Sequence, residues 1–450
     1  MLIEFSCENY KCFAHEVRLQ LTAANFSQHP NHVREVSDQL SALRAIAIYG
    51  ANAAGKTKLV EAIKFARGFI NNPRRANAGI PHFPFILDKK LSEAPSRFEF
   101  IFFYRNQLFT YGFVAGAKHI EEEWLFVSVG KREYRCFERK TSSAGKVEVE
   151  ISTGLARKNT SALKRYSELK HATAANQLFI NKLDDFQSER ANDVVTWFED
   201  VLTIIEANSS YTSLELRAHI EQEFVSFIGD YLRNSYTGVD SIETIVESFD
   251  AAKHLPGLSA DKVEEIVAPL RISPDKSLLI QRGESSVLKI SQVDGKLSVV
   301  RLQTIHKSTE GKDVAFGFEN ESAGTQRLAN LLPAIYDLKF SERVYVIDEL
   351  DRKLHPLLTK NLVQNFLDST GCQNGQLIFT THETHLLDQE MLRRDEVWFI
   401  EKNIKNGESE LIPLTEFEVR HDLKIEKGYL QGRFGAIPFF SEPSLVEKII

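Results

Sequence analysis

The sequence GANAAGKT at residues 50–57 constrains the fold more than any other feature of this 450-residue chain. It matches the pattern GxxxxGK(S/T), follows an apolar run at 45–49 that is typical of a buried strand, and precedes a helical pattern at 58–70. Glycines allow such a loop to curl so that its backbone N–H groups face an anion, and the start of the next helix adds partial positive charge. The sequence therefore predicts a phosphate-binding loop between a buried strand and a helix.

The residue types within this loop predict separate roles. Lys56 should reach the β- and γ-phosphates of a nucleotide, and the hydroxyl of Thr57 should help to hold Mg²⁺. We expect the phosphates to be bound by Gly50, Asn52, Ala53, Ala54, Gly55, Lys56 and Thr57. The cofactors predicted on this basis are a nucleotide and Mg²⁺, and the family resemblance given below implies that the nucleotide is ATP.

Two acidic residues, Asp348 and Glu349, follow an apolar run at 344–347. A buried strand would deliver them to its carboxyl end, where ligands lie in open α/β sheets. Asp348 is the expected partner of Mg²⁺, and Glu349 is the group expected to orient and deprotonate the attacking water. Acids at the end of an apolar strand are common, so this interpretation depends on the phosphate loop.

His382 lies at the tip of a third strand pattern, QLIFT at 376–380. An imidazole there can donate a hydrogen bond to the γ-phosphate and sense whether that group is present. The alternative is a polar residue that only closes a strand, and we prefer that alternative for His385.

A second anion-binding surface is predicted at residues 322–326, SAGTQ, ahead of a helical run at 329–336. Ser322 supplies a hydroxyl, Gly324 allows close backbone approach, and the helix supplies its N-terminus. Because phosphoryl transfer needs charge stabilisation on all sides of the γ-phosphate, this segment should complete the nucleotide site.

The pattern along the rest of the chain predicts an α/β fold class with a mixed central sheet. Short aromatic or β-branched runs from 97 to 151 predict an antiparallel meander, and apolar residues at spacings of three and four predict helices between 160 and 271. Two strand patterns on either side of Asp294-Gly295 predict a hairpin. From residue 322 onward helices alternate with strands, which indicates a mostly parallel sheet.

Composition narrows the function further. The net charge of −7 provides no general basic field for DNA, although local basic patches are still allowed. The four cysteines lack CxxC spacing, which argues against a disulfide framework or a zinc site and favours a reducing cytoplasm. No window approaches about 20 apolar residues, so we expect no membrane span and a cytoplasmic location.

The motifs together resemble the ABC-type ATPase heads of the SMC, recombination-repair and overcoming-lysogenization-defect groups. The resemblance rests on the phosphate loop and on ESAGTQ at 321–326, VYVIDE at 344–349, LDRKLHP at 350–356 and TTH at 380–382. ENYKCF at 8–13 is similar to the ENFKSF strand turn of SMC-like heads, where the basic residue, here Lys11, lies near the nucleotide. Residues 379–402 and 428–439 resemble small bacterial AAA-labelled, ABC-type ATPases of phage-defence and restriction islands, which usually act with a separately encoded effector.

The resemblance implies a homodimer, or an assembly of dimers, in which two heads meet head to tail around two ATP molecules. Ser322 and Gly324 would then act on ATP held by the other subunit, Asp351 would lie in the D-loop at the dimer seam, and His382 would be the switch histidine. Glu321 and Thr325 depart from the transporter signature, and the Q-loop glutamine has no assigned position. We expect residues 1–155 and 275–450 to form the two halves of an ATPase head and residues 156–274 to form a helical arm.

The leading hypothesis is a sensor or regulatory ATPase of an anti-phage system that responds to a phage-derived trigger and gates a separate nuclease or toxin. One alternative is a DNA-binding repair ATPase of the recombination type, which the net charge disfavours. Another is a self-contained anticodon nuclease that uses Arg165, Glu168 and His171, although a solvated helix face explains these residues equally well. Nucleic-acid binding stays open, and Lys89-Lys90 and Arg393-Arg394 are expected to be surface charge.

Overall fold

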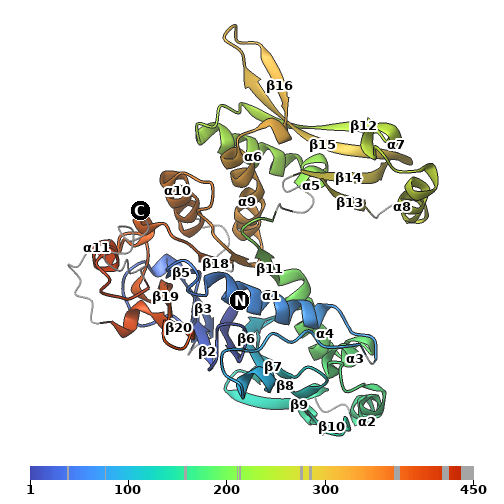
Figure 1. Cartoon of the computed structure of the whole chain (residues 1–450), viewed down its shortest axis with the longest axis vertical. Coiled ribbons are helices and arrows are strands. Elements are labelled where there is room, and N and C mark those ends of the chain that lie inside the picture. Colours follow the sequence, from blue (N-terminus) through green and yellow to red (C-terminus); the bar gives the residue numbers. More distant parts are fainter. Residues whose placement is uncertain are drawn as a thin grey trace, which may run out of the picture. The chain divides into compact units, whose positions relative to one another are not determined.

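The chain forms two compact units in the computed structural model (Figure 1). Unit 1 comprises Met1–Ile204, Leu338–Leu350 and Val363–Ile450, and unit 2 comprises Ile205–Asp337 and Asp351–Leu362. The structure describes residues 1–37, 40–76, 78–156, 160–209, 211, 214–273, 277–282, 286–368, 375–417 and 425–436. Cys372 and residues 437–439, on which parts of the sequence analysis rest, lie outside these ranges. The first boundary between the units, at Ile205, comes later in the chain than the expected start of the arm at 156.

Within the described residues, the central sheet of unit 1 has six strands in the order β11-β17-β18-β5-β19-β20. Their bounds are Ala45–Gly50 for β5, Leu202–Ile205 for β11, Val344–Ile347 for β17, Gln376–Thr380 for β18, Val397–Lys402 for β19 and Ser409–Pro413 for β20. Strands β17, β18, β5 and β19 run parallel, and β20 is antiparallel to β19. Strands β5, β17 and β18 are buried along their whole length, which explains their continuous apolar sequences. The predicted mixed central sheet is confirmed.

The predicted meander is also confirmed. It forms an antiparallel sheet in the order β10-β9-β8-β7-β6-β1-β2, so two N-terminal strands extend it. The bounds are Leu2–Glu8 for β1, Val17–Gln20 for β2, Ser96–Tyr104 for β6, Gln107–Ala115 for β7, Ile120–Val129 for β8, Arg132–Thr141 for β9 and Val147–Ile151 for β10. Strands β3, Val33–Ser37, and β4, Leu40–Leu43, form a separate pair.

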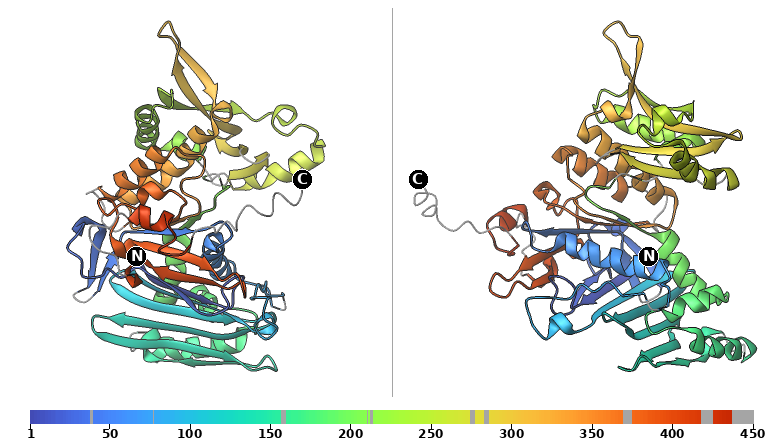
Figure 2. Two further views of the ribbon diagram at one scale, coloured as in Figure 1. Left: turned by 60° about the vertical axis from the view of Figure 1, so that its left-hand side comes forward. Right: turned by 45° about the vertical axis from the view of Figure 1, so that its right-hand side comes forward.

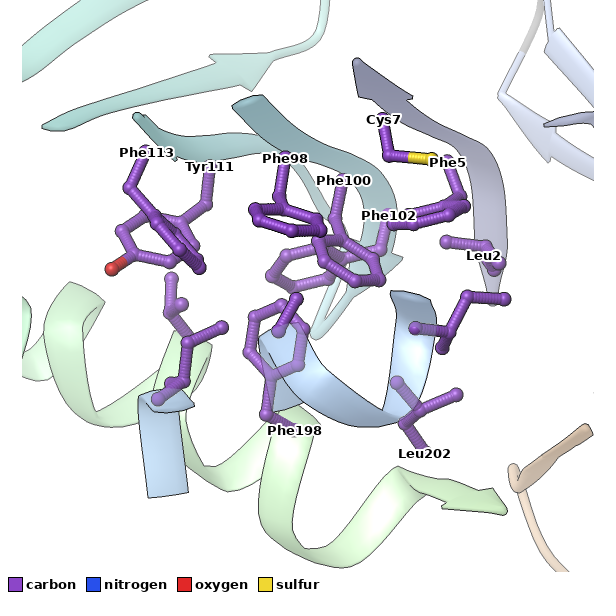
Figure 3. Packing of buried hydrophobic residues seen from close by; sticks show 14 of the residues in the cluster. Leu2, Phe5, Cys7, Phe98, Phe100, Phe102, Tyr111, Phe113, Phe198 and Leu202 are labelled. Atoms are coloured by element: carbon purple, nitrogen blue, oxygen red, sulfur yellow. The ribbon is translucent and has the colours of Figure 1, made fainter. Parts of the chain in front are cut away.

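Helix α1, Lys56–Asn71, packs into the core that lies behind the meander. Its buried residues recur at spacings of three and four and include Leu59, Val60, Ile63, Ala66, Phe69 and Ile70. The ring of Phe69 stacks on Phe113 at 5.5 Å between centroids, and Phe100 meets Phe198 edge to face at 4.9 Å. Figure 3 shows the aromatic side chains of β1, β6 and β7 directed towards Phe198. The core therefore fixes the helix that follows the phosphate loop.

The remaining helices of unit 1 include three that contribute buried residues to this core and one whose Tyr429 packs against Tyr49 and Phe399. They are α2, Thr160–Leu169, α3, Phe179–Asp185, α4, Glu189–Thr196, and α11, Ile425–Leu430, with a π-helical turn at Trp197–Val201. Helix α10, Pro356–Leu367, begins in unit 2 and ends in unit 1. None of the helices in the described part of the chain is long and apolar enough to cross a membrane.

Unit 2 combines helices with an antiparallel sheet in the order β12-β15-β14-β13, with β16 paired to β15. The strands are β12, Ser241–Ser248, β13, Ser277–Arg282, β14, Ser286–Val293, β15, Lys296–Lys307, and β16, Asp313–Gly317. The helices are α5, Leu214–Ile220, α6, Gln222–Asn234, α7, Ala251–His254, α8, Ala260–Ile272, and α9, Ala323–Phe340, which ends in unit 1. Both views in Figure 2 show β15 and β16 extending together beyond the rest of this sheet.

The expected hairpin at Asp294-Gly295 is confirmed, because Val293 pairs with Lys296 and both turn residues have positive φ. Most of the segment from 160 to 271 is helical as predicted. Two parts of it, β11 and β12, are strands instead. The sequence of β12, SIETIVES, is rich in β-branched residues and pairs with β15 along its full length, so tertiary pairing decided its structure.

One charge assignment was wrong. Arg393, expected at the surface, is buried, and its guanidinium donates hydrogen bonds to Asp395 and to three carbonyl oxygens between residues 24 and 28. A buried guanidinium needs this full set of acceptors. Lys89 and Lys90 are exposed, as expected.

We predict that Phe198→Ala lowers the free energy of unfolding by about 3–5 kcal/mol, because it leaves a cavity in the aromatic core beside α1. Phe186→Ala is the matched control, since Phe186 is 45% exposed and its loss should change stability by less than about 0.5 kcal/mol. Urea unfolding followed by circular dichroism measures both values. Equal losses for the two variants would show that the core does not depend on Phe198.

Candidate nucleotide site

The loop at 50–57 joins β5 to α1 and requires its two glycines for different reasons. A Cβ atom at Gly50 would lie 2.7 Å from the carbonyl oxygen of Ile400, so no side chain fits there. Gly55, which precedes the first turn of α1, has a φ of 127°, a conformation that L side chains rarely adopt. Ala53 also has positive φ, at 62°. The loop is therefore tightly curled at the N-terminus of a buried helix.

The ammonium group of Lys56 lies against this loop. Its Nζ donates hydrogen bonds to the carbonyl oxygens of Gly50, at 2.7 Å, and Ala51, at 3.3 Å, and the residue is largely buried. Burial restricts where a long side chain can place its charge. The positive charge of Lys56 is thus held at the loop that the sequence analysis assigned to phosphate binding.

Two segments outside the loop hold it in place. The hydroxyl of Ser409, at the start of β20, donates a 2.6 Å hydrogen bond to the carbonyl oxygen of Ala54, and its N–H donates to the carbonyl of Cys12. A Cβ at Gly55 would lie 3.1 Å from both the Cys12 sulfur and the Ser409 hydroxyl. Burial raises the pKa of the Cys12 thiol, so it remains protonated near neutral pH. No local sequence pattern marks Ser409, which lies some 350 residues from the loop that it holds.

The acidic pair at the end of β17 is fixed by a threonine on the neighbouring strand. The Thr380 hydroxyl donates a 2.6 Å hydrogen bond to Asp348 Oδ1 and accepts one of 2.8 Å from the Glu349 N–H. Glu349 has a φ of 48°, which is uncommon for a residue with a side chain. The sequence predicts Thr380 only as the end of a strand, but its position is a usable signal, because the ends of parallel strands meet at one edge of a sheet.

A cavity of about 840 Å³ brings most of the predicted residues together. Its lining includes Lys11, Asn52, Ala53, Gly55, Lys56, Thr57, Glu349 and His382. Asp348, which precedes Glu349 in the sequence, is buried and does not line the cavity. The segment at 82–87, which the sequence analysis did not consider, lines the same cavity.

Lys11 contributes a positive charge and forms an ion pair with Glu61 of α1. Its ammonium donates a 2.5 Å hydrogen bond to Glu61, which also accepts one of 3.0 Å from Lys58. Partial burial would raise the pKa of Glu61, but the hydrogen bonds from the two lysines outweigh it and lower that pKa. Glu61 therefore stays ionised, and its bond to Lys11 restrains an ammonium group that lines the cavity.

The predicted signature residues Ser322 and Gly324, together with Asp351, belong to unit 2, whereas all the other predicted site residues belong to unit 1. The Ser322 hydroxyl accepts a 3.1 Å hydrogen bond from the Thr325 N–H and so caps the start of α9. A Cβ at Gly324 would lie 3.0 Å from the Lys353 carbonyl oxygen. Ser322 thus caps α9, and Gly324 in its first turn allows close approach of the segment that follows Asp351.

Glu321, where a transporter signature has leucine, connects this cap to the sheet of unit 2. Its carboxylate pairs with His306 Nε2 at 2.7 Å and accepts a hydrogen bond from the Thr304 hydroxyl. Both partners lie on β15, the strand that continues into the extended hairpin with β16. The departure from the transporter pattern therefore has a structural role in holding the residue before Ser322.

The residues considered for a nuclease site are Arg165, Glu168 and His171, and all three are exposed on or just after α2. The Arg165 guanidinium lies 5.7 Å from the ring centre of Tyr166. None of the three lines the cavity that holds Lys56. Their surroundings fit a solvated helix face.

A curled phosphate loop between a buried parallel strand and a helix, with acids at the end of a nearby strand, defines a P-loop nucleotide-binding protein. The family described as "AAA domain, putative AbiEii toxin, Type IV TA system" matches residues 45–388. Because that match covers most of the sequence, the chain belongs to this family of AAA-type ATPase domains. None of the curated proteins matches the sequence.

Solved structures of SMC heads are similar to the chain at a low level. An SMC head domain from Thermotoga maritima is 12% identical, with 93% of this chain and 99% of that chain covered and a TM-score of 0.39. An SMC head bound to the C-terminal winged-helix domain of ScpA is 11% identical, with 95% and 99% covered and a TM-score of 0.42. A head with an extended coiled coil, bound to the C-terminal domain of ScpA derived from Pyrococcus furiosus, is 12% identical, with 96% and 98% covered and a TM-score of 0.37. Values this low assign neither an activity nor a partner.

We predict that Thr380→Val lowers magnesium-dependent ATP turnover about tenfold, because it removes the group that bonds to both Asp348 and the Glu349 N–H. Thr380→Ser keeps the hydroxyl and should turn over ATP at a rate close to that of the wild type. Phosphate release at saturating ATP measures both rates. Wild-type turnover by the valine variant would remove Thr380 from the site.

Proposed function

We propose that the chain is an ATP hydrolase that binds ATP and Mg²⁺ in the cavity of unit 1. One observation carries this proposal: a single cavity is lined by Lys56 and Thr57 of the loop, by Glu349 and by His382. These groups come from three parallel strands or the segments that follow them, and each has the chemistry that phosphoryl transfer requires.

In the proposed reaction, the loop N–H groups and Lys56 bind the phosphates while Glu349 orients and deprotonates the attacking water. His382 contacts the γ-phosphate from the segment after β18, the strand that lies between β5 and β17. Thr57 and Asp348 would hold Mg²⁺, since a hydroxyl and a carboxylate are the oxygen ligands that this ion prefers. Mg²⁺, when bound, neutralises charge on the phosphate oxygens. Thr380 holds the Asp348 carboxylate and the Glu349 backbone in position for metal binding and water activation.

We propose that two chains form the complete site. Ser322 and the N-terminus of α9 offer an anion-binding surface in unit 2, and Gly324 allows close backbone approach. In a head-to-tail dimer, this surface would contact ATP held by Lys56 of the other chain, and Asp351 would lie at the seam. ATP would then join the two heads, and hydrolysis would release them.

We further propose that this cytoplasmic ATPase is the sensor or regulatory subunit of a bacterial anti-phage system and gates a separate nuclease or toxin after a phage-derived trigger. The support is the resemblance of residues 379–402 to ATPases of defence islands, together with a family description that names a toxin and a TA system. The lifetime of the ATP-bound dimer would then set how long the effector is controlled.

Subunit mixing tests the shared site. Lys56→Ala and Ser322→Ala should each abolish most ATP turnover when pure, because every dimer then lacks one half of both sites. An equal mixture, after subunit exchange, should regain about a quarter of wild-type turnover, because half of the dimers are mixed and each mixed dimer holds one intact site. Phosphate release measures the recovery.

The matched control is a mixture of Lys56→Ala with Glu349→Gln. Both residues lie in the same cavity of one chain, so no mixed dimer contains an intact site and no turnover should return. Glu349→Gln alone should accumulate as an ATP-bound dimer, which mass photometry detects. If the Ser322→Ala mixture also stays inactive, the site is not shared between chains.

Nucleic-acid assays separate the proposed regulatory role from the two alternatives. A recombination-type repair ATPase would bind plasmid DNA with affinity that falls steeply as salt rises. A self-contained nuclease would cleave tRNA. We expect the purified protein with ATP, as wild type and as Glu349→Gln, to do neither in gel-shift and cleavage assays, and either activity would replace the regulatory proposal.

A further inference from the structure

We propose that the segment at 83–87, FPFIL, is the wall of the nucleotide site that binds the base, and that it favours a purine. This inference rests on the proposed function and adds the part of the site that distinguishes one nucleotide from another. It concerns the apolar part of the cavity lining.

The lining of the cavity includes two chemical kinds of residue. Polar and charged residues come from the loop and also include Lys11, Glu349, His382 and Lys402. The apolar side chains of the wall are those of 83–87, and the Lys11 ammonium lies 5.2 Å from the centre of the Phe83 ring. Within this wall Ile86 is 75% exposed and Leu87 is 66% exposed. Exposed large apolar residues that gather beside a charged pocket mark a surface that contacts an apolar group.

Backbone hydrogen bonds hold the wall in position. The Phe83 carbonyl accepts a 2.8 Å hydrogen bond from the Lys11 N–H, and the Phe85 N–H donates one of 2.9 Å to the Asn9 side chain. Asn9 is buried, and its amide nitrogen donates to carbonyl oxygens at 91, 94 and 95. The wall is therefore attached to the turn after β1, next to the phosphate loop.

Ring packing and a glycine complete this positioning. The Phe83 ring meets Tyr10 and Phe65 edge to face, with centroids 6.3 and 5.9 Å apart. Leu87 packs so closely on Gly407 that a side chain at that glycine would collide with it. Gly407 lies in the turn between β19 and β20, so both Leu87 and the opposing turn line the cavity.

A nucleotide carries the same two kinds of chemical group as the cavity lining, because it joins a charged phosphate chain to a flat apolar ring. Once the loop and Lys56 bind the phosphates, the remaining space and the apolar wall suit the base. The side chains of Phe, Pro, Ile and Leu carry no hydrogen-bonding group, so they distinguish bases by contact area. A purine offers more area than a pyrimidine.

The test compares ADP with pyrophosphate, which lacks a base, by calorimetric titration in Mg²⁺. These ligands avoid hydrolysis and the contact that the γ-phosphate would make in a dimer. The variant Ile86→Ser with Leu87→Ser should weaken ADP binding about tenfold and leave pyrophosphate binding unchanged. The wild type should bind ADP and GDP more tightly than CDP.

The matched control is Ile404→Ser with Leu430→Ser, which removes the same side chains from positions that are 88% and 59% exposed and do not line the cavity. It should bind all four ligands as the wild type does. Unchanged ADP affinity in the wall variant, an equal loss for pyrophosphate, or a preference for CDP would overturn the inference. Failure of the proposed function would look different, because the wild type would bind neither ADP nor pyrophosphate, or Lys56→Ala would bind both normally.

Discussion

The burial of helix α1 against the aromatic core is the interaction on which the candidate site depends. Phe69 and Phe113, and Phe100 with Phe198, fix the helix between the meander and the central sheet. The phosphate loop leads directly into that helix. Because the helix is fixed by packing, the backbone N–H groups of the loop keep their orientation towards an anion. A loop with the same glycines on a loosely packed helix would lose this orientation.

Single polar side chains then connect distant segments to the loop. Thr380 joins the two acids of β17 to the next strand, Ser409 holds Ala54, and Asn9 anchors the apolar wall. Each bond lies in a partly or fully buried setting, where an unpaired group would be costly, so each arrangement is specific. These bonds hold both the charged and the apolar residues of the cavity lining in position. The two kinds of residue give the proposed ATPase a basis for binding both parts of its substrate.

Features that depend on neighbouring residues were predictable. The loop, the helix after it, the meander and the hairpin at Asp294-Gly295 follow from short-range patterns, and the structure contains all of them. The segment of β12 was expected to be helical. That prediction failed because its strand structure depends on pairing with β15, some 60 positions away in the sequence. Arg393 was expected at the surface because its acceptors between 24 and 28 are equally remote.

The sequence by itself determined the phosphate loop, the acids at 348 and 349 and the alternation of strands and helices, because steric freedom, hydrogen-bonding capacity and periodicity are properties of adjacent residues. Only the tertiary structure decided that Glu349, His382, Lys11 and the segment at 83–87 line one cavity with the loop. It also decided that Ser409 and Thr380 hold that cavity in shape. The physical reason is that parallel strand order and buried hydrogen bonds join residues hundreds of positions apart, and no local pattern encodes such pairings.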